Sequence, residues 1–356
     1  MEIKHISAKP YSIGLKKPFS YHTLTLTTLP YTLITTQTDE SIQGNGEAAL
    51  AWDVTGETQA GSIEAVTLVR DVIEDKKLNS VQDVQSILSD LESELYGNTG
   101  IKTAIESALL DALGKKVNKP IFELLGGKKK DSVTTIKTLS FEDQESSGLI
   151  DSIADALSKN VPYIKLKVGG DENAEKETIA TIASAFPDIK LIFDANQAWN
   201  TPKEALGFIS KINPENIAWL EQPFSAHNFE AFAALKKELP VSLMADESCH
   251  TLFDLKNLHR VCAIDMINIK LAKTGGLLET KRMIEYCKNN SIQYVLGDMI
   301  HSSIGTAYNL HAATLGDFMC YDLTRPDRID SNMSKGLVYH DFDIEIPTGF
   351  GLGVPA

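Results

Sequence analysis

Eight short apolar or β-branched runs alternate with amphipathic segments over the last two thirds of the chain. Repeated strand–helix units make the strands parallel, because each helix returns the chain to the edge at which the next strand begins. Eight units favour a closed (β/α) barrel over an open, doubly wound sheet, although periodicity alone leaves both possible. The runs are SVTTIKTLS, YIKLKV, IKLIFDA, IAWLEQP, VSLMADE, AIDMINIK, IQYVLGD and FMCYDL.

The N-terminal third follows a different pattern. Residues 2–47 alternate like an antiparallel meander, with a turn predicted at Gly44-Asn45-Gly46. In residues 58–125 apolar side chains recur at intervals of three and four, which predicts helices. Strands followed by helices indicate an α+β domain, and the Gly- and Pro-rich tail is expected to pack back on it. The predicted division is an α+β domain over residues 1–125, a barrel over 126–324 and a tail over 325–356.

Composition excludes several classes of partner. The 356 residues contain 48 acidic and 34 basic side chains, so the formal net charge is −14 and neither nucleic acid nor an anionic membrane is an expected partner. No apolar stretch approaches the roughly 18 residues of a membrane span. The four cysteines form no CxxC pair, which is typical of reduced thiols and predicts a cytoplasmic protein.

Acidic side chains end three successive strands of the predicted barrel, at Asp194, Glu221 and Asp246. In a parallel barrel the C-terminal strand ends meet at one face, where reactive side chains gather. Three carboxylates at that face suit a hard divalent cation, and we predict Mg²⁺ with water and substrate oxygens completing its coordination. The alternative interpretation, a helix N-cap or a surface acid, is common for one Asp but does not explain three in register.

Lysines flank these acids along the predicted barrel. Lys165 and Lys167 lie two residues apart on one strand and therefore face the same side. If both face inward, their like charge lowers the pKa of one of them toward the range of a general base; a solvent-exposed pair is the alternative. Lys270 ends a strand four places away. Two lysines on opposite faces of a substrate held at the cation would remove and return an α-proton, which predicts inversion at carbon.

Nine short motifs extend over almost the whole chain. They are KPF (17–19), GNGEA (44–48), LLGG (124–127), KLKVG (165–169), DANQAW (194–199), EQP (221–223), MADES (244–248), INIKLAKTGG (267–276) and GLG (351–353). Each motif alone is weak, whereas the set is specific. Together they resemble the enolase superfamily, in its muconate-lactonizing-enzyme subgroup, and most closely the dipeptide epimerases.

This resemblance implies a fold, a cofactor and a reaction. The fold is a modified (β/α)₇β barrel of the α/β class, covered by an α+β capping domain made from both ends of the chain. The three acids would bind Mg²⁺, Lys167 and Lys270 would form the acid/base pair, and Lys165 would tune Lys167 and contact the substrate carboxylate. The implied reaction inverts the C-terminal residue of an L-Ala-L-Xaa dipeptide, with L-Ala-D/L-Glu expected, through 1,1-proton transfer. A homo-oligomer acting on peptidoglycan peptides is expected.

Related reactions of the subgroup are alternatives: N-succinylamino acid racemase, o-succinylbenzoate synthase and muconate cycloisomerase share most of these residues. In the dipeptide epimerases an Asp-x-Asp motif after the eighth strand holds the substrate ammonium. Here Asp322 keeps the first acid and Thr324 replaces the second, and both are predicted substrate contacts. An acid at position 322 suits an ammonium and opposes dicarboxylates or N-acylated amines. We predict that Asp298 supplies the missing charge; an N-cap is the alternative.

The resemblance also implies substrate contacts in the capping loop after KPF. Ala-Glu enzymes can place an arginine there for the glutamate carboxylate, and this chain has Leu24 instead. Lys137 or His22 is the candidate replacement cation. The other predicted contacts are Tyr21 and Thr135 with the substrate, and Asn196, Asn268 and Glu247 as groups that orient the carboxylates.

Two residues near the site receive ordinary structural interpretations. Lys273 is interpreted as capping or lining the loop after Lys270, and His301 as a polar residue at a helix start.

Two other functional classes are considered: a noncatalytic barrel that keeps the metal site, and a Schiff-base aldolase using Lys270 or Lys167. The lysines argue against the first class, because a structural cation needs none beside it.

Overall fold

The computed structural model describes residues 1–21, 24–141 and 146–355, and an eight-stranded parallel sheet dominates it. A parallel bridge between Thr135 and Tyr321 joins the segment entering the first strand to the last strand, so the sheet closes. The predicted barrel is confirmed, and the open-sheet alternative is wrong. The strands are β5 (Lys137–Ser140), β6 (Ile164–Lys167), β7 (Leu191–Asp194), β8 (Ile217–Glu221), β9 (Ser242–Ala245), β10 (Met266–Ile269), β11 (Gln293–Gly297) and β12 (Tyr321–Asp322).

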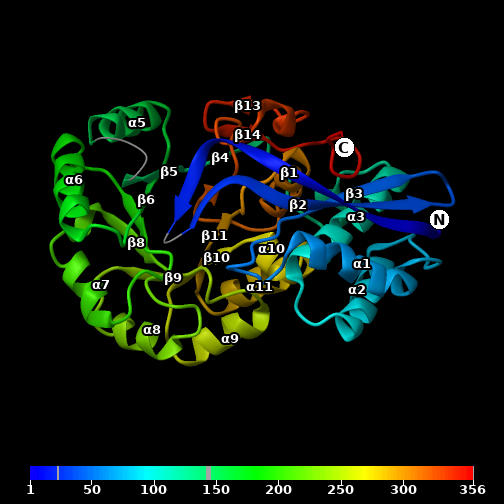
Figure 1. The fold of residues 1–356 in the computed structure, drawn as a ribbon, viewed down its shortest axis with the longest axis horizontal. Helices are drawn as coiled ribbons and strands as arrows, with labels where there is room; N and C mark the ends of the chain where they lie inside the picture. Colours follow the sequence, from blue (N-terminus) through cyan, green and yellow to red (C-terminus); the bar gives the residue numbers. More distant parts are fainter. Residues whose placement is uncertain (22–23, 142–145, 356) are drawn as a thin grey trace.

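Helices connect successive strands and cover the outside of the barrel (Figure 1). In the described part of the chain no α-helix follows β12, so the barrel is of the (β/α)₇β type. Capping boxes fix several helix starts; for example, the Thr251 side chain and the Asp254 side chain bond to each other's backbone N–H. The helices are α5 (Ser146–Ser158), α6 (Glu172–Ala185), α7 (Pro202–Ile209), α8 (Phe229–Lys236), α9 (Leu252–Arg260), α10 (Leu271–Thr274), α11 (Leu277–Asn289) and α12 (Ser303–Ala312), with a 3₁₀ turn η2 (Pro214–Asn216).

The inside of the barrel contains an apolar layer below a polar one. The layers follow the two-residue period of the strands, because every second side chain faces inward. The apolar layer excludes water from below, so the charges above it must neutralise one another. The inward pairs, apolar residue first, are Ile136 and Thr138, Tyr163 and Lys165, Ile192 and Asp194, Trp219 and Glu221, Met244 and Asp246, Met266 and Asn268, Val295 and Gly297, and Cys320 and Asp322.

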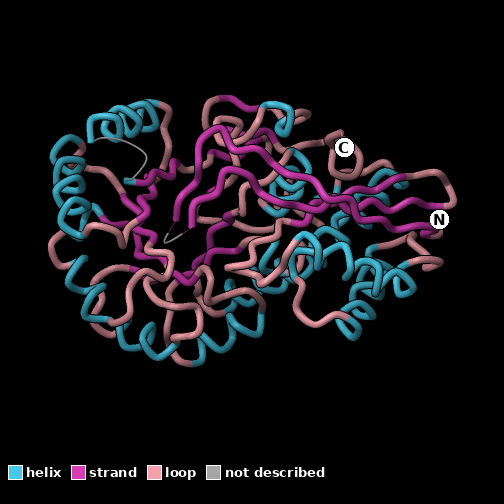
Figure 2. The backbone as a smooth tube through the Cα atoms, in the orientation of Figure 1, coloured by secondary structure: helices cyan, strands magenta, loops and turns pink. Residues whose placement is uncertain are grey.

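The N-terminal residues form the predicted α+β unit beside the barrel. Its long β1–β2 hairpin reaches toward the open end of the barrel, as the tube in Figure 2 also shows. Helix α3 packs on β3 and α10, and all its residues from Gly100 to Gly114 are buried. The elements are β1 (Ile3–Tyr21), β2 (Leu24–Thr38), β3 (Gln43–Ala48), α1 (Gln59–Ile73), α2 (Val81–Glu94), α3 (Thr99–Val117) and α4 (Ile121–Leu124).

The turn predicted at Gly44-Asn45-Gly46 is wrong. These residues lie within β3 and pair with β2, and the chain turns before them, between Thr38 and Gln43. A Cβ on Gly44 would lie 2.0 Å from the Ala108 carbonyl oxygen, and one on Gly46 only 1.9 Å from the Ala104 carbonyl oxygen. The glycines therefore allow β3 to approach α3 closely, a packing requirement that resembles a turn signal in the sequence.

The C-terminal tail contacts both parts of the molecule. Its strands β13 (Tyr339–His340) and β14 (Asp343–Glu345) pair with β4 (Ser132–Thr134), and a 3₁₀ turn η3 (Ser331–Ser334) precedes them. Residues 328–330 run antiparallel to residues 14–16 of β1, and the Leu352 N–H donates to Asp111 of α3. The tail therefore contacts the capping unit, while the domain bounds at residues 125 and 324 stay a prediction.

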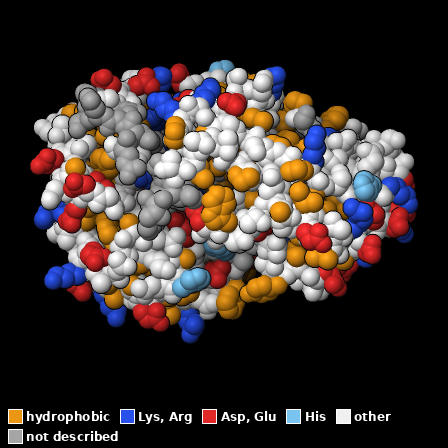
Figure 3. Space-filling model, in the orientation of Figure 1, with side chains coloured by type: hydrophobic (Ala, Val, Ile, Leu, Met, Phe, Trp, Pro, Cys, Tyr) orange, Lys and Arg blue, Asp and Glu red, His pale blue; other side chains and the backbone are white. Residues whose placement is uncertain are grey.

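Surface charges of both signs are interspersed on the face shown in Figure 3, mainly toward its edges, with apolar side chains nearer the middle. No helix in the described ranges is long and apolar enough to cross a membrane. The cellular compartment and the oligomeric state stay predictions.

Glu106 of α3 links the capping unit to the barrel. Its Oε1 accepts hydrogen bonds from the backbone N–H groups of Leu277 and Leu278, at the start of α11, and from the Tyr308 hydroxyl. Burial raises the pKa of Glu106 to about 7 in spite of these donors. The folded chain therefore holds a proton that an unfolded chain releases near the ordinary value of 4.5.

We expect the wild-type chain to lose stability, relative to Glu106→Gln, as the pH rises from 4.5 to about 7. Glutamine keeps an oxygen for the three donors but cannot ionise, and a pKa difference of this size corresponds to about 3 kcal/mol. Urea unfolding at about pH 5 and about pH 8 measures the difference, with Glu285→Gln on the exposed side of α11 as the control. Parallel pH curves for wild type and Glu106→Gln would contradict this account.

Candidate active site

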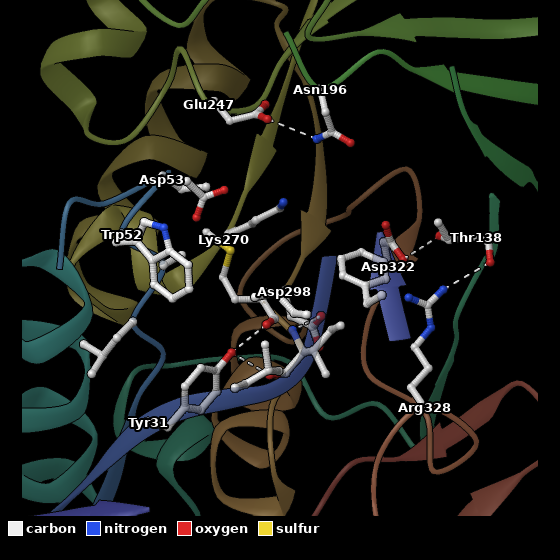
Figure 4. A pocket seen from close by; sticks show the side chains of 18 of the residues that line it. Tyr31, Trp52, Asp53, Thr138, Asn196, Glu247, Lys270, Asp298, Asp322 and Arg328 are labelled. Atoms are coloured by element: carbon white, nitrogen blue, oxygen red, sulfur yellow. Dashed lines mark hydrogen bonds between the residues drawn. The ribbon is translucent and has the colours of Figure 1, made fainter. Parts of the chain in front are cut away.

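A pocket opens at the C-terminal ends of the barrel strands, below the β1–β2 hairpin and the loop after β3. Figure 4 shows Asp322 and Arg328 on one side of it and Trp52 and Asp53 on the other. The barrel supplies most of its polar lining, which includes Lys165, Lys167, Asn196, Glu247, Lys270 and Asp298.

The three predicted metal ligands come together at this end of the barrel. Asp194 and Glu221 are the last residues of β7 and β8, and Asp246 directly follows β9. None of the three is more than 1% exposed. Lys165 Nζ lies 2.8 Å from both Asp194 Oδ2 and Glu221 Oε2 and so joins the first two acids. Asp246 Oδ2 instead lies 2.7 Å from Lys270 Nζ.

Lysines reach the acids from both flanks. Lys167 on β6 lies 2.7 Å from Asp194 Oδ2, and Lys270 follows β10 beside Asp246. The strand order β6–β7–β8–β9–β10 places the three acid-bearing strands between the two lysines. Lys165 and Lys167 both contact Asp194, so both face inward as predicted, and the solvent-exposed alternative is wrong.

The carboxylates dominate the electrostatics of the cluster. Burial opposes the charge of Lys165, but Asp194 and Glu221 raise its pKa well above the usual value. Burial likewise opposes the charge of Lys270, and Asp246 raises its pKa. Of the like-charge pair Lys165 and Lys167, Lys165 therefore does not have the lowered pKa predicted for one of them. Burial and the neighbouring Asp194 raise the pKa of Glu221 to about 8, so Glu221 keeps a proton at neutral pH without a cation.

The donor set fits a hard divalent cation such as Mg²⁺. In the described part of the chain no three acidic, His or Cys side chains already surround a metal-sized space, because ammonium groups lie among the carboxylates. Asp246 Oδ2 is nevertheless buried, and its described partner is the Lys270 ammonium at 2.7 Å. Three buried carboxyl groups provide the oxygen ligands that such a cation requires, and binding it would favour their ionised forms. Asp194, Glu221 and Asp246 are the residues that would hold it.

Amide and carboxyl side chains support the acids and lysines. Asn268 Nδ2 donates to Glu221 Oε1 at 2.9 Å. Asn196 Oδ1 accepts from Lys167 Nζ at 2.5 Å, and its Nδ2 donates to Glu247 Oε1 at 3.0 Å. These positions are the ones that the predicted orienting roles of Asn196, Asn268 and Glu247 require, and the roles themselves stay predictions.

Lys273 is fully buried behind the site, so the interpretation of Lys273 as a loop-lining residue is wrong. Its ammonium donates to Asp246 Oδ1 and to the backbone carbonyls of Asp246, Asn268 and Cys249. One side chain therefore fixes the ends of β9 and β10 and compensates part of the charge of Asp246.

Asp322, the predicted ammonium-binding acid, ends β12 close to the lysines. Its Oδ2 lies 3.4 Å from Lys165 Nζ, and its Oδ1 accepts the Thr138 hydroxyl at 3.0 Å. Burial favours the neutral form of Asp322, but Lys165 and Arg328 hold its pKa below the usual value. Asp322 is therefore an ionised acid between two cations. No sequence motif marks Thr138 or Arg328, which both line the pocket.

Asp298 and Thr324 form one hydrogen-bonded unit. Asp298 Oδ2 accepts the Thr324 hydroxyl at 2.6 Å and its N–H at 2.5 Å, while Oδ1 accepts the Ile300 N–H at 3.1 Å. The N-cap of α12 is Ser302, so the N-cap alternative for Asp298 is wrong. Thr324 is buried behind Asp298, which lines the pocket. Burial raises the pKa of Asp298, and its role toward the substrate stays a prediction.

Like the buried Thr324, two further predicted substrate contacts lie outside the pocket. Thr135 is buried at the barrel seam, where its hydroxyl donates to the Tyr321 carbonyl at 3.0 Å. Lys137 precedes the pocket-lining Thr138 on β5 and therefore faces the outside of the barrel, 3.9 Å from Asp327. The structure thus corrects both assignments, and Thr138 is the pocket residue from this strand.

The hairpin and neighbouring loops give the pocket an apolar roof. His22 lies outside the described residues, and only the backbone of Tyr21 and Leu24 is described, at the end of β1 and the start of β2. The predicted contacts at the hairpin tip therefore stay untested. The apolar lining includes Phe19, Leu26, Leu29, Trp52, Met299 and Ile300.

A buried pair joins the capping sheet to the barrel beside the pocket. Glu47 Oε1 lies 2.6 Å from His301 Nδ1, and Glu47 Oε2 accepts the hydroxyls of Tyr11 and Ser302. Burial opposes the charge of His301, but Glu47 raises its pKa. The His301 N–H also donates to Thr324. His301 directly precedes the N-cap of α12, as its interpretation as a polar helix-start residue requires, but its partner Glu47 is 254 positions away and could not be predicted.

Family comparisons cover most of the chain. Residues 6–126 match the mandelate racemase / muconate lactonizing enzyme N-terminal domain, and residues 149–356 match the enolase C-terminal domain-like family. The chain belongs to the enolase superfamily, in its muconate-lactonizing-enzyme subgroup. The resemblance drawn from the nine motifs is therefore confirmed, and so is the expected enolase-like architecture.

Similar proteins catalyse more than one reaction. An L-Ala-D/L-Glu epimerase of Clostridium acetobutylicum is 29% identical over 99% of this chain and 99% of its own. An N-succinyl-L-Arg/Lys racemase of Bacillus cereus is 27% identical over 88% of this chain and 84% of its own. The crystal structure of a dipeptide epimerase from Enterococcus faecalis, complexed with Mg and L-Leu-L-Tyr, has a TM-score of 0.90 at 27% identity over 100% of both chains. This superfamily member is accordingly an isomerase, and its substrate must be argued from the site.

We expect Lys273→Met to destabilise the fold by about 3–5 kcal/mol, because it leaves the buried Asp246 carboxylate without one of its charge partners. Urea unfolding in the presence of chelator measures the loss without a contribution from a bound cation. Lys281→Met is the control, since Lys281 is exposed and donates only to the Leu125 carbonyl. A loss below about 1 kcal/mol would show that Lys273 is dispensable for the buried charge balance.

Proposed function

We propose that this isomerase is a magnesium-dependent dipeptide epimerase that inverts the C-terminal residue of L-Ala-L-Xaa dipeptides, L-Ala-D/L-Glu included. The observation that carries the proposal is the placement of Lys167 and Lys270 on opposite flanks of three buried carboxylates. Two amines on opposite faces of one carbon can remove a proton from one side and return a proton from the other. A single base could exchange the proton but not invert the centre.

The residues of this chain divide the work as follows. Asp194, Glu221 and Asp246 would hold the cation, and a bound Mg²⁺ supplies the positive charge that stabilises an enolate. Lys165 contacts two of these acids from the pocket side and is placed to bind the substrate carboxylate. Lys167 and Lys270 move the α-proton. The apolar layer below the site keeps water from reaching the exchanging amines from beneath.

The two ends of the substrate meet different surroundings. Asp322, with Asp298 beside it, suits the ammonium of an N-terminal residue, because both acids line the same side of the pocket. The apolar side chains from the hairpin and neighbouring loops suit an apolar side chain on the C-terminal residue, and they also suit a long one. Lys137, the expected partner of a glutamate side chain, does not line the described pocket. We therefore include apolar C-terminal residues among the proposed substrates.

N-succinylamino acid racemisation is the second candidate, and Arg328 beside Asp322 is the observation that favours it, since a guanidinium suits a succinyl carboxylate. Both reactions use the same proton transfer. o-Succinylbenzoate synthesis and muconate cycloisomerisation differ in their products, because they form or consume a carbon–carbon double bond.

A screen of L-Ala-L-Xaa dipeptides in D₂O with Mg²⁺ tests the proposal. Epimerisation adds one deuterium at the C-terminal α-carbon, which a mass shift and the loss of the ¹H α-signal report. Chelator should abolish the exchange, and Mg²⁺ should restore it. Exchange with N-succinylamino acids but no dipeptide would favour the second candidate. Chelator-resistant turnover together with borohydride trapping of a lysine would instead support a Schiff-base enzyme.

We expect Lys167→Ala and Lys270→Ala each to abolish epimerisation and to retain α-proton exchange with one epimer only, opposite for the two variants. Each lysine faces one side of the α-carbon, so the remaining lysine can still exchange the proton that points toward it. Incubating the L,L and L,D dipeptides separately in D₂O with each variant measures this. If both variants exchange the same epimer, the two lysines do not act from opposite faces.

We expect Asp298→Asn to raise the KM for dipeptides about 10-fold while leaving Mg²⁺ affinity unchanged, because the substitution removes a carboxylate near the substrate ammonium and not a metal ligand. Asparagine keeps an oxygen for the Thr324 donors. Steady-state kinetics at varied dipeptide and varied Mg²⁺ separates the two effects. Unchanged kinetics would rule out a role for Asp298 in ammonium binding.

A further inference from the structure

Arg328 is a pocket cation supplied by the C-terminal tail. The backbone around Arg328 pairs with β1, since the Lys16 N–H donates to the Arg328 carbonyl at 3.0 Å and the Asp330 N–H to the Gly14 carbonyl at 3.1 Å. The side chain crosses to the barrel, where Nη2 donates to the Thr138 carbonyl at 3.1 Å. Its Cζ lies 5.7 Å from the centre of the Phe19 ring in the hairpin. The guanidinium is therefore held in place from three directions.

Most of the hydrogen-bonding capacity of Arg328 is unused within the described residues. A guanidinium has five N–H donors, and the Thr138 carbonyl accepts from only one of its nitrogens. No described carboxylate lies within ion-pair distance of Arg328, whereas the neighbouring Arg325 pairs with Asp327 at 3.1 Å. In Figure 4 the Arg328 guanidinium points toward Asp322 and Thr138 at one side of the pocket. A fixed, planar and largely unsatisfied donor group of this kind suits a carboxylate.

The charge around Asp322 leads to the same conclusion. Asp322 already lies 3.4 Å from Lys165 and accepts the Thr138 hydroxyl, so one acid stands between two cations. Asp298 forms no ion pair with Arg328 within the described residues, and its oxygens accept three hydrogen bonds from Ile300 and Thr324. A substrate that brought only an ammonium to this end would leave the Arg328 charge uncompensated. A substrate that also brought a carboxylate would satisfy both Asp322 and Arg328.

We propose that Arg328 binds a second carboxylate of the substrate, carried by its acyl part at the Asp322 end of the pocket. This inference rests on the proposed function and makes its substrate class narrower. Two sources share the chemistry: a dipeptide whose first residue is acidic, or an N-succinylamino acid. In the dipeptide the ammonium meets Asp322 and the side-chain carboxylate meets Arg328; in the succinyl compound the carboxylate meets Arg328 alone.

Matched substrate pairs that differ only in this carboxylate test the proposal. One pair is L-Glu-L-Leu and L-Gln-L-Leu; the other is N-succinyl-L-leucine and N-butanoyl-L-leucine. We expect wild type to prefer the carboxylate member of one pair in kcat/KM for α-proton exchange. Arg328→Gln should reduce that preference about 10- to 100-fold, and Arg328→Lys should retain part of it, because lysine keeps the charge but not the forked geometry. The pair that responds identifies the source.

Arg325→Gln is the control, since Arg325 stacks on Phe342, pairs with Asp327 and does not line the pocket. It should leave the preference unchanged. An equal loss for both members of each pair in Arg328→Gln would mean that Arg328 only supports the hairpin, and the proposal would be overturned. A loss confined to L-Ala-L-Glu against L-Ala-L-Gln would also overturn it, because the carboxylate would then belong to the C-terminal residue.

Calorimetric titration of the same four compounds distinguishes a failure of the carboxylate site at Arg328 from a failure of the proposed reaction. It measures the dissociation constants in wild type and Arg328→Gln without requiring turnover. If no compound exchanges its α-proton but the carboxylate member still binds more tightly through Arg328, the proposed reaction fails and the carboxylate site stands. If exchange proceeds and the binding ratio does not depend on Arg328, the reaction stands and the carboxylate site fails.

Discussion

Compensation of buried charge at the open end of the barrel is the constraint on which the site depends. Three carboxylates and four lysines share a region with an apolar layer beneath it, and an isolated charge there would cost several kcal/mol. The strands and helix α10 place the lysines around the acids, so each of the four ammonium groups contacts at least one of the three acids. A divalent cation bound among these acids would add positive charge, and a substrate carboxylate would offset part of it.

Buried acids also set the position of the capping unit over this cluster. Glu47 bonds to His301 and Ser302, Glu106 to the N–H groups that begin α11, and Asp111 to the N–H of Leu352 in the tail. Each contact is directional and buried, so it fixes an orientation that apolar packing alone would leave adjustable. The hairpin that covers the pocket is positioned through the Tyr11 contact with Glu47 and through the pairing of residues 14–16 of β1 with residues 328–330 of the tail.

The barrel, the meander and the acid and lysine positions are predictable because their signals are local. A strand end is predicted from a few neighbouring residues. Asp194 and Glu221 are the last residues of their strands, and Asp246 directly follows its strand. Thr135 and Lys137 were misassigned because a run such as SVTTIKTLS does not fix where its strand begins, and a shift of one residue reverses the inward face. Lys273, His301 and Arg328 could not be placed, since their partners lie far along the chain; Arg328 and Thr138 are 190 residues apart.

The groups proposed to move the proton and those proposed to select the substrate have different origins in the chain. Lys167, Lys270 and the three acids belong to barrel strands, whereas Phe19 and Arg328 come from segments near the two ends of the chain that pair with each other. A change in either end segment can alter the surroundings of the acyl group without moving a lysine relative to an acid. Substrate selection could therefore change without a change in the proposed proton-transfer groups, and proteins of similar identity to this chain include both an L-Ala-D/L-Glu epimerase and an N-succinyl-L-Arg/Lys racemase.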